Sequence, residues 1–214
     1  MKKGFTLVEM MVALMIFSIV AVVALTALVR IIDANKKAQT IQDVVVNMSF
    51  TLESMTRELR SGSSYYCEYP LGQNGMTVNS NMSSSVLACQ AGVSGSPTSS
   101  SGAGIAFRSD QIISGQNGCR LIYAYEIVPN FSGGTFNGTF TFKKAAQTAC
   151  NQNLTGSDFV PVIDTSSLSL TDYYFRIRNT PTPLFFLNLK GNSGTKENTK
   201  TFFSLQTAAS PRIP

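Results

Sequence analysis

The residues with the clearest chemical potential lie at the start of the chain, which begins MKKGFTLVEMMVAL. Hydrolysis of the bond between Gly4 and Phe5 would create a new α-amino group, which is positively charged at neutral pH. This amine would lie four residues before Glu9, the one charged residue between Phe5 and Val29. A carboxylate in an apolar segment costs roughly 2–3 kcal/mol unless it has a partner. We therefore expect the amine of Phe5 to pair with Glu9, within one chain or between neighbouring chains.

The second group of reactive residues is the set of four cysteines: Cys67, Cys89, Cys119 and Cys150. None belongs to a Cys-x-x-Cys pair, so a zinc or dithiol redox site is not predicted. An even number of cysteines in an exported chain favours disulfides, and four cysteines allow three connectivities. We expect sequence neighbours to pair, Cys67 with Cys89 and Cys119 with Cys150. The alternative is four free thiols in a reducing compartment.

The composition argues against catalysis. The chain has no histidine, which removes the commonest general base and the commonest metal ligand. No phosphate-binding loop, dinucleotide fingerprint or nucleophile elbow is present, and the aspartates are too widely spaced for a calcium loop. We predict that the protein is not an enzyme and has no metal or cofactor. Its 17 basic residues form no cluster, so no nucleic-acid partner is predicted.

The segment that must position Glu9 is a long apolar helix. The 25 residues from Phe5 to Val29 would extend over about 37 Å, enough to span a hydrocarbon core of roughly 30 Å. Lys2 and Lys3 precede the segment, which predicts a cytoplasmic N-terminus and an external C-terminal part. One alternative is a secretory signal cut near Ala24–Ala27, although its apolar run exceeds the usual length. Another is an uncut anchor, which leaves Glu9 without a partner.

The stretch KKGFTLVEMMVALMIFSIVAVVAL resembles the prepilin signal of type IV pilins and type II secretion pseudopilins. The resemblance implies that prepilin peptidase cuts after Gly4 and N-methylates Phe5. It also implies that Glu9 aligns subunits in a filament. The implied partners are prepilin peptidase, other pilin or pseudopilin subunits and an inner-membrane assembly platform. The implied location is the cytoplasmic membrane, crossed once with the head outside, and then a filament in the periplasm or at the cell surface.

The helical pattern continues beyond Arg30 as one apolar stripe on an amphipathic helix. The stripe contains Ala34, Ala38, Ile41, Val45, Met48, Leu52, Met55 and Leu59. Acid-to-base pairs four residues apart, Asp33 with Lys37 and Glu53 with Arg57, are expected on the solvated sides. We predict one helix from Phe5 to Ser61, ending before Gly62. Its second half packs on a sheet of the same chain; a coiled coil is the alternative.

The remainder of the chain predicts an antiparallel β-sheet. Residues 79–104 are rich in Ser and Gly and are expected to form a surface loop. Strands are predicted at 104–109, 120–128, 135–144, 167–179, 184–191 and 200–207, with hairpins at 132–134 and between the last two. The fold class is therefore α+β: a long N-terminal helix, transmembrane then amphipathic, packed on a C-terminal antiparallel head.

Four regions follow from these patterns: a leader at 1–4, a transmembrane or filament-core helix at 5–29, its amphipathic continuation at 30–61 and a β-rich extracytoplasmic head at 62–214. The ending TFFSLQTAASPRIP resembles the closing strand of J-type pseudopilins and the W-type minor pilins related to them. Together the patterns predict a minor pilin or pseudopilin of a type IV pilus or type II secretion system. The alternative is a membrane-anchored surface binding module that never polymerises, and a contact role in DNA uptake is a third option.

Overall fold

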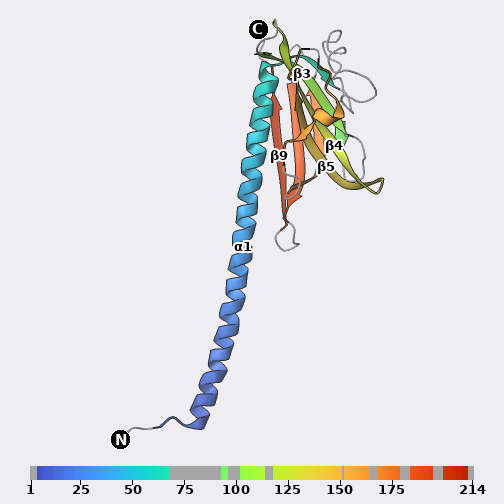
Figure 1. Ribbon diagram of the computed structural model, residues 1–214. Coiled ribbons are helices and arrows are strands. Elements are labelled where there is room, and N and C mark those ends of the chain that lie inside the picture. The colour runs from blue at the N-terminus through green and yellow to red at the C-terminus, as the bar shows by residue number, and fades with distance from the viewer. Residues whose placement is uncertain are drawn as a thin grey trace.

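The computed structural model consists of one very long helix and a β-rich head at its C-terminal end (Figure 1). It describes residues 4–67, 93–95, 102–113, 118–150, 152–163, 168–178, 184–194 and 200–211. The elements are α1 (Leu7–Ser61), β1 (Ser63–Cys67), β2 (Val93–Gly95), β3 (Ala103–Ile112), β4 (Arg120–Ser132), β5 (Thr135–Ala146), the 3₁₀ turn η1 (Gly156–Asp158), β6 (Val160–Pro161), β7 (Leu168–Arg178), β8 (Leu184–Ser193) and β9 (Thr201–Ala209). The predicted α+β class is confirmed.

Helix α1 has 55 residues and is therefore about 82 Å long. Its lower part projects well beyond the head, and only its upper part lies against the sheet (Figure 1). The helix ends before Gly62, as predicted. The hydroxyl of Tyr65 lies 2.8 Å from the carbonyl oxygen of Leu59 and 2.6 Å from that of Gly62. Its single proton can serve one of these two oxygens at a time, and the Leu59 oxygen also accepts from the backbone N–H of Gly62 at 3.2 Å.

The strands form a sheet with nine members among the described residues. Its main path runs β1-β3-β4-β5-β7-β8-β9 with every pair antiparallel, while β2 pairs with β7 and β6 with β5. The two predicted hairpins are present. Gly133 and Gly134 connect β4 to β5 with φ angles of 58° and 82°, and two positive φ angles are what a tight hairpin of this hand requires.

Some elements differ from the sequence prediction. The short strands β1, β2 and β6 were not predicted, and β2 lies inside the segment 79–104 that was expected to be a loop. Strand β3 also begins within that segment, at Ala103; the rest of the predicted loop lies outside the described residues. Short strands with few apolar side chains give little period-two signal, and their extended backbone depends on partners that are distant in the sequence.

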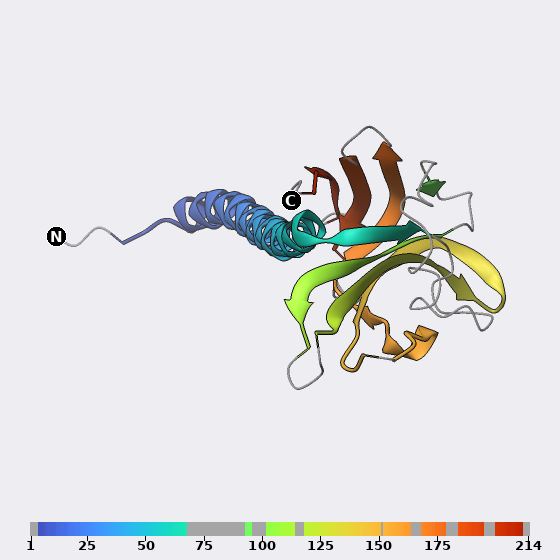
Figure 2. The same cartoon turned by 90° about the horizontal axis from the view of Figure 1, so that it is seen from above.

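The main core lies between the upper part of α1 and one face of the sheet. The helix contributes Val44, Met48, Thr51, Leu52, Met55 and Leu59, all buried. The sheet contributes mainly aromatic and branched side chains, among them Phe107, Tyr125, Phe142, Tyr173 and Leu189. Viewed along the helix, the strands curve around the end of α1 (Figure 2).

The lower part of the predicted stripe does not join this core. Ile41 is 41% exposed and Val45 is 48% exposed, and Ala34 and Ala38 are also exposed. The first buried helix residue is Val44, one position before Val45 and therefore about 100° around the helix. The prediction was wrong here because the period identifies an apolar face but does not show how far along the helix the sheet extends.

A hydrogen-bonded ion pair fixes the helix to the centre of the sheet. Lys144 of β5 donates from Nζ to Glu58 Oε1 of α1 at 2.6 Å, and both side chains are mostly buried. The Tyr125 hydroxyl donates to Glu58 Oε2, also at 2.6 Å. Burial raises the pKa of Tyr125, and its bond to the Glu58 carboxylate raises it further. The tyrosine therefore stays protonated and serves as a donor.

Removing the lysine from this cluster should weaken the packing of the helix on the head. In a Lys144→Met variant Glu58 keeps the tyrosine bond but loses its counter-ion, so we expect a loss of about 1–3 kcal/mol in the free energy of unfolding of the head. Chemical denaturation of the full chain in detergent, followed by tyrosine fluorescence, measures this loss. Glu53→Gln is the matched control. It removes the exposed pair between Glu53 and Arg57 (3.0 Å), which should contribute at most about 0.5 kcal/mol.

A value for Lys144→Met no larger than that of Glu53→Gln would contradict the role of the pair. Both variants break a salt bridge that includes a glutamate of α1, and the pairs differ in burial: Glu58 is 17% exposed, whereas Glu53 is 70% exposed. Lys144→Met also removes the ammonium group that lies 4.6 Å from the centre of the Tyr123 ring.

Candidate functional site

The start of α1 is set by a side-chain cap. Thr6 has extended backbone angles, and its Oγ1 accepts a hydrogen bond from the backbone N–H of Glu9 at 3.3 Å. This bond supplies a partner for one of the free N–H groups of the first turn. Sequence reasoning missed Thr6, although Thr6-Leu-Val-Glu9 matches the Ser/Thr-x-x-Glu pattern that is typical of helix N-termini. The helix consequently begins at Leu7 rather than at Phe5.

Gly4 and Phe5 lie just before the helix in backbone without regular secondary structure. Both are exposed, and Phe5 is 75% exposed. A Cβ atom added to Gly4 would meet no atom within 4 Å. The peptide bond between these residues is therefore free of the helical hydrogen-bond ladder and is not covered by other described parts of the chain. A protease can bind it without unfolding the helix.

Glu9 lies in the first turn of α1 and is exposed. A carboxylate at this end of a helix is stabilised by the partial positive charge of the free N–H groups. The ion pairs among the described residues do not include it: they join Arg57 to Glu53, Lys144 to Glu58 and Lys190 to Asp172. The uncut chain has no α-amino group at Phe5. The pairing of that amine with Glu9 therefore stays a prediction about the processed protein.

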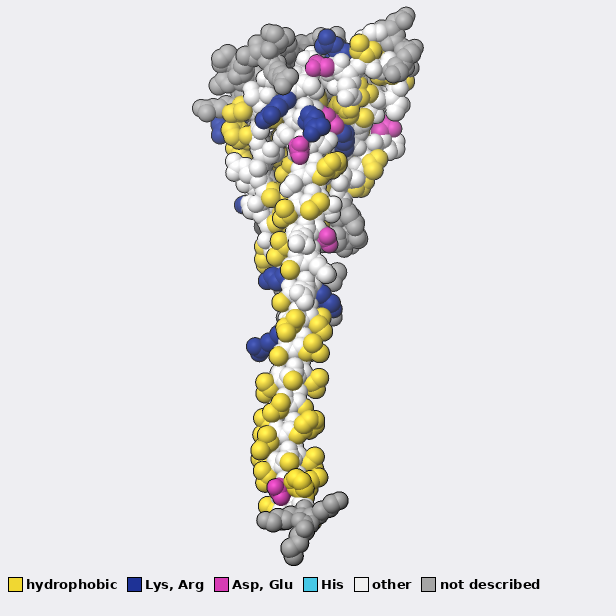
Figure 3. Space-filling view, turned by 90° about the vertical axis from the view of Figure 1, so that its left-hand side faces the viewer, with side chains coloured by type: hydrophobic (Ala, Val, Ile, Leu, Met, Phe, Trp, Pro, Cys, Tyr) yellow, Lys and Arg dark blue, Asp and Glu magenta, His cyan; other side chains and the backbone are white. Residues whose placement is uncertain are grey.

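The surface around Glu9 is almost entirely apolar. Every large hydrophobic side chain from Leu7 to Ile32 is exposed, and Figure 3 shows this part of the helix covered by hydrophobic side chains, with an acidic side chain near its lower end. The helix is long and apolar enough to cross a membrane. Full exposure of such side chains to water costs about 1.5–3 kcal/mol for each large one. The segment therefore needs a lipid environment or neighbouring helices.

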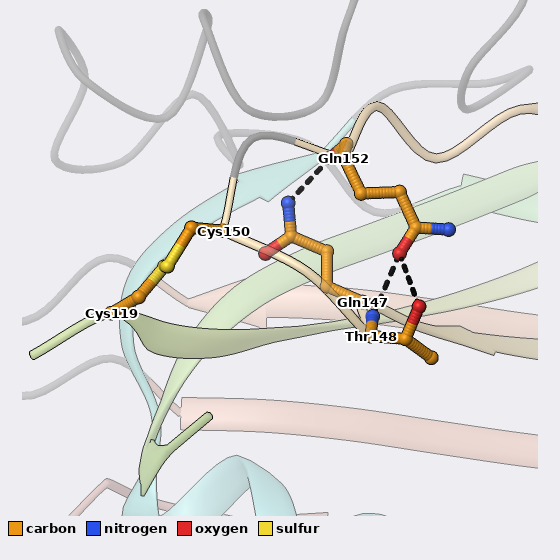
Figure 4. Close-up of a disulfide and its surroundings, with 5 residues drawn as sticks. All are labelled: Cys119, Gln147, Thr148, Cys150 and Gln152. Atoms are coloured by element: carbon orange, nitrogen blue, oxygen red, sulfur yellow. Dashed lines mark hydrogen bonds between the residues drawn. A yellow bond between two sulfur atoms is a disulfide. The ribbon is translucent and has the colours of Figure 1, made fainter. Parts of the chain in front are cut away.

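The predicted cysteine sites lie in the head, far from the N-terminus. Cys119, just before β4, forms a disulfide with Cys150, and their Cα atoms are 5.6 Å apart (Figure 4). Gln147 Nε2 donates to the carbonyl oxygen of Gln152 at 2.6 Å, which helps to close the turn that carries Cys150. Cys67 ends β1. Its predicted partner, Cys89, lies outside the described residues.

The described residues of the head were also compared with the requirements of a metal centre. Within the described parts of the chain, no three His, Cys, Asp or Glu side chains lie close enough together to hold a metal ion. The features that can be tied to a function are therefore the ones at the N-terminus: an accessible Gly4–Phe5 bond, a capped helix start, Glu9 and an exposed apolar surface.

Comparison with known proteins also identifies the N-terminal region of the chain. A family model described as the prokaryotic N-terminal methylation motif matches residues 1–25. No curated protein and no solved structure shows significant similarity to the chain. The motif, together with one long N-terminal helix followed by an antiparallel sheet, supports membership of a type IV pilin-like family whose members are processed at the N-terminus.

Proposed function

We propose that this type IV pilin-like protein is a minor pilin or pseudopilin. Prepilin peptidase cuts it after Gly4 and methylates the new amine of Phe5. The processed chain then joins a filament, or the complex at its tip, through α1. The match to the N-terminal methylation motif at residues 1–25 carries this proposal, because it coincides with the accessible bond and the exposed apolar helix.

Assembly into a filament would keep the exposed apolar side chains of α1 out of water. In the membrane, the side chains of residues 5–29 are covered by lipid. In a filament, equivalent helices pack side by side, so the same side chains stay out of water after extraction. Glu9 then enforces the axial register, because a subunit stacked at the wrong height leaves a charge without its partner. Residues 30–61 connect this core to the head, and residues 1–4 are the leader that is removed.

The location and partners follow from this scheme. The chain first crosses the cytoplasmic membrane once with its head outside, consistent with Lys2 and Lys3 on the cytoplasmic side. Its partners are prepilin peptidase, other pilin or pseudopilin subunits and the inner-membrane assembly platform. The match to the family motif ends at residue 25. Our proposal of a J-type or W-type minor subunit therefore depends on the resemblance of the closing strand.

Mass spectrometry of the N-terminus tests the processing step. Protein purified from its native membranes or filaments should begin at Phe5 and carry one methyl group on the α-nitrogen. A chain that begins at Met1 would instead support a membrane anchor that never polymerises. A chain cut near Ala24–Ala27 would support an ordinary secreted protein. Either result would overturn the proposal.

A further inference from the structure

A polar pocket lies on the face of the sheet that is turned away from α1. Its volume is about 410 Å³, and it is lined by Ser63, Ser64, Arg108, Gly118, Cys119, Arg120, Ile122, Gln147 and Cys150. Volumes of this size are typical of small-molecule sites. Two of the described residues that line the pocket are arginines, and none of the described lining residues is acidic. Its chemistry is therefore cationic and rich in hydrogen-bond donors.

The register of the strands places both arginines on one face. Ser63 of β1 pairs with Arg108 of β3, and Arg108 pairs with Ile122 of β4. Arg120 precedes Ile122 by two residues on the same strand, so its side chain points to the same face. The two guanidinium groups thus start from diagonal positions on neighbouring strands, close enough to act on one anionic group. No described residue forms an ion pair with either arginine.

Gln147 supplies a second, independent sign of a ligand. The residue is only 2% exposed, and its side-chain Oε1 has no hydrogen-bond partner. Its Nε2 donates to the carbonyl oxygen of Gln152. Exchanging the positions of Oε1 and Nε2 would place two acceptor oxygens next to each other, so the orientation of the amide is fixed. Figure 4 shows the free oxygen on the side of Cys150, which also lines the pocket. A buried acceptor in this state calls for a hydroxyl or N–H donor.

The backbone at the edge of the pocket is also unusual. Ser64 has a φ angle of 53°, the one described non-glycine residue with a positive φ, and it lies at an irregularity in the pairing of β1 with β3. Such bulges redirect side chains, and residues held in this conformation are concentrated at ligand sites. A serine therefore occupies, at the edge of the pocket, a conformation that glycine adopts more easily.

We propose that this pocket binds an acidic sugar, a small molecule that carries one carboxylate and several hydroxyl groups. The carboxylate lies between Arg108 and Arg120, where two guanidinium groups provide paired donors. The hydroxyl groups meet the two serines and donate toward Gln147 Oε1. Among its described lining residues there is no aromatic residue and one aliphatic side chain, Ile122, so these residues do not supply the apolar anchors of a protein–protein contact. The proposal does not depend on filament assembly.

Ligand-observed NMR or calorimetry on the full chain in detergent tests this site. The probes are D-glucuronate, D-glucose, inorganic phosphate and an acidic dipeptide. We expect glucuronate to bind saturably and more tightly than the other three. Arg108→Gln and Arg120→Gln should each weaken glucuronate binding about tenfold or more. Arg176→Gln, an exposed arginine of β7 that does not line the pocket, is the matched control and should have no effect.

Three results would overturn the proposal. The first is the absence of glucuronate binding, or binding that the two arginine variants do not weaken. The second is phosphate binding as tight as that of glucuronate, which indicates a simple anion site. The third is tighter binding of the dipeptide, which indicates a peptide carboxylate. Circular dichroism checks the fold of each variant. If a glutamine variant does not fold, a lysine is placed at the same position. Lysine keeps the positive charge but cannot donate to a carboxylate in the bidentate way of arginine, so it should still weaken glucuronate binding.

Discussion

Glu9→Ala should leave the protein folded, cleaved and methylated but largely exclude it from filaments. The side chain of Glu9 is exposed and forms no ion pair among the described residues, so its removal costs the isolated chain little. In the assembled state the variant leaves the amine of Phe5 without a partner in an apolar core. At roughly 2–3 kcal/mol, this loss corresponds to about a 30- to 140-fold reduction in incorporation at equilibrium.

Quantitative immunoblotting of sheared filaments against the membrane fraction measures this effect. Ser18→Ala is the matched control: Ser18 lies in the same apolar segment, but its hydroxyl bonds within its own helix, to the carbonyl oxygen of Met15 at 2.8 Å. It should assemble normally. Glu9→Gln separates charge from hydrogen bonding and should behave like Glu9→Ala if the charge matters. Normal incorporation of Glu9→Ala into filaments would contradict the proposal that Glu9 aligns the subunits.

The sequence predicts the elements whose signal is local. Residues 5–61 contain no proline or glycine and have an uninterrupted helical pattern, and the structure forms one helix over nearly all of them. The strands from β3 to β9 with alternating or aromatic-rich sequence were also predicted, with their boundaries shifted by a few residues. Gly133 and Gly134 marked the turn between β4 and β5 because only such residues take two positive φ angles easily.

Other features depend on contacts between distant residues, and no local pattern reveals them. Lys144 and Glu58 form an ion pair across 86 positions of the sequence, and nothing near either residue identifies the other. Arg108 and Arg120 become neighbours only through the register of β3 with β4. The length of helix that contacts the sheet also depends on distant residues. The apolar face continues on the N-terminal side of Val44, but the sheet does not cover it there.

The candidate site at the N-terminus differs from these features, because its residues are close together in the sequence. The spacing of Phe5 and Glu9 suggested that they pair, and the resemblance to the prepilin signal predicted the roles of Gly4, Phe5 and Glu9. The structure adds the Thr6 cap and the exposure of the Gly4–Phe5 bond. It cannot bring Phe5 and Glu9 together as an ion pair, because the amine is created only by cleavage. The decisive evidence about this site must therefore come from processed protein.

Gly4→Leu should block that cleavage. The substitution is harmless to the fold, because no atom lies within 4 Å of a Cβ added to Gly4 and the residue precedes the helix. Any effect must therefore arise in the complex with the peptidase, where the missing side chain of glycine lets the enzyme approach the backbone closely. The intact mass of the variant should include residues 1–4 and lack the methyl group. Gly4→Ala, with a single added carbon, should be cleaved more slowly.

The same variant also tests the order of events. If the Phe5 amine exists only after cleavage, Gly4→Leu fails to assemble for the same reason as Glu9→Ala, and combining the two changes adds no further loss. An additive loss would mean that Glu9 acts before or independently of the amine. Fully mature protein from Gly4→Leu would show that glycine is not needed at the cleavage site. The intact mass and the filament fraction, measured on the same cultures, separate these outcomes.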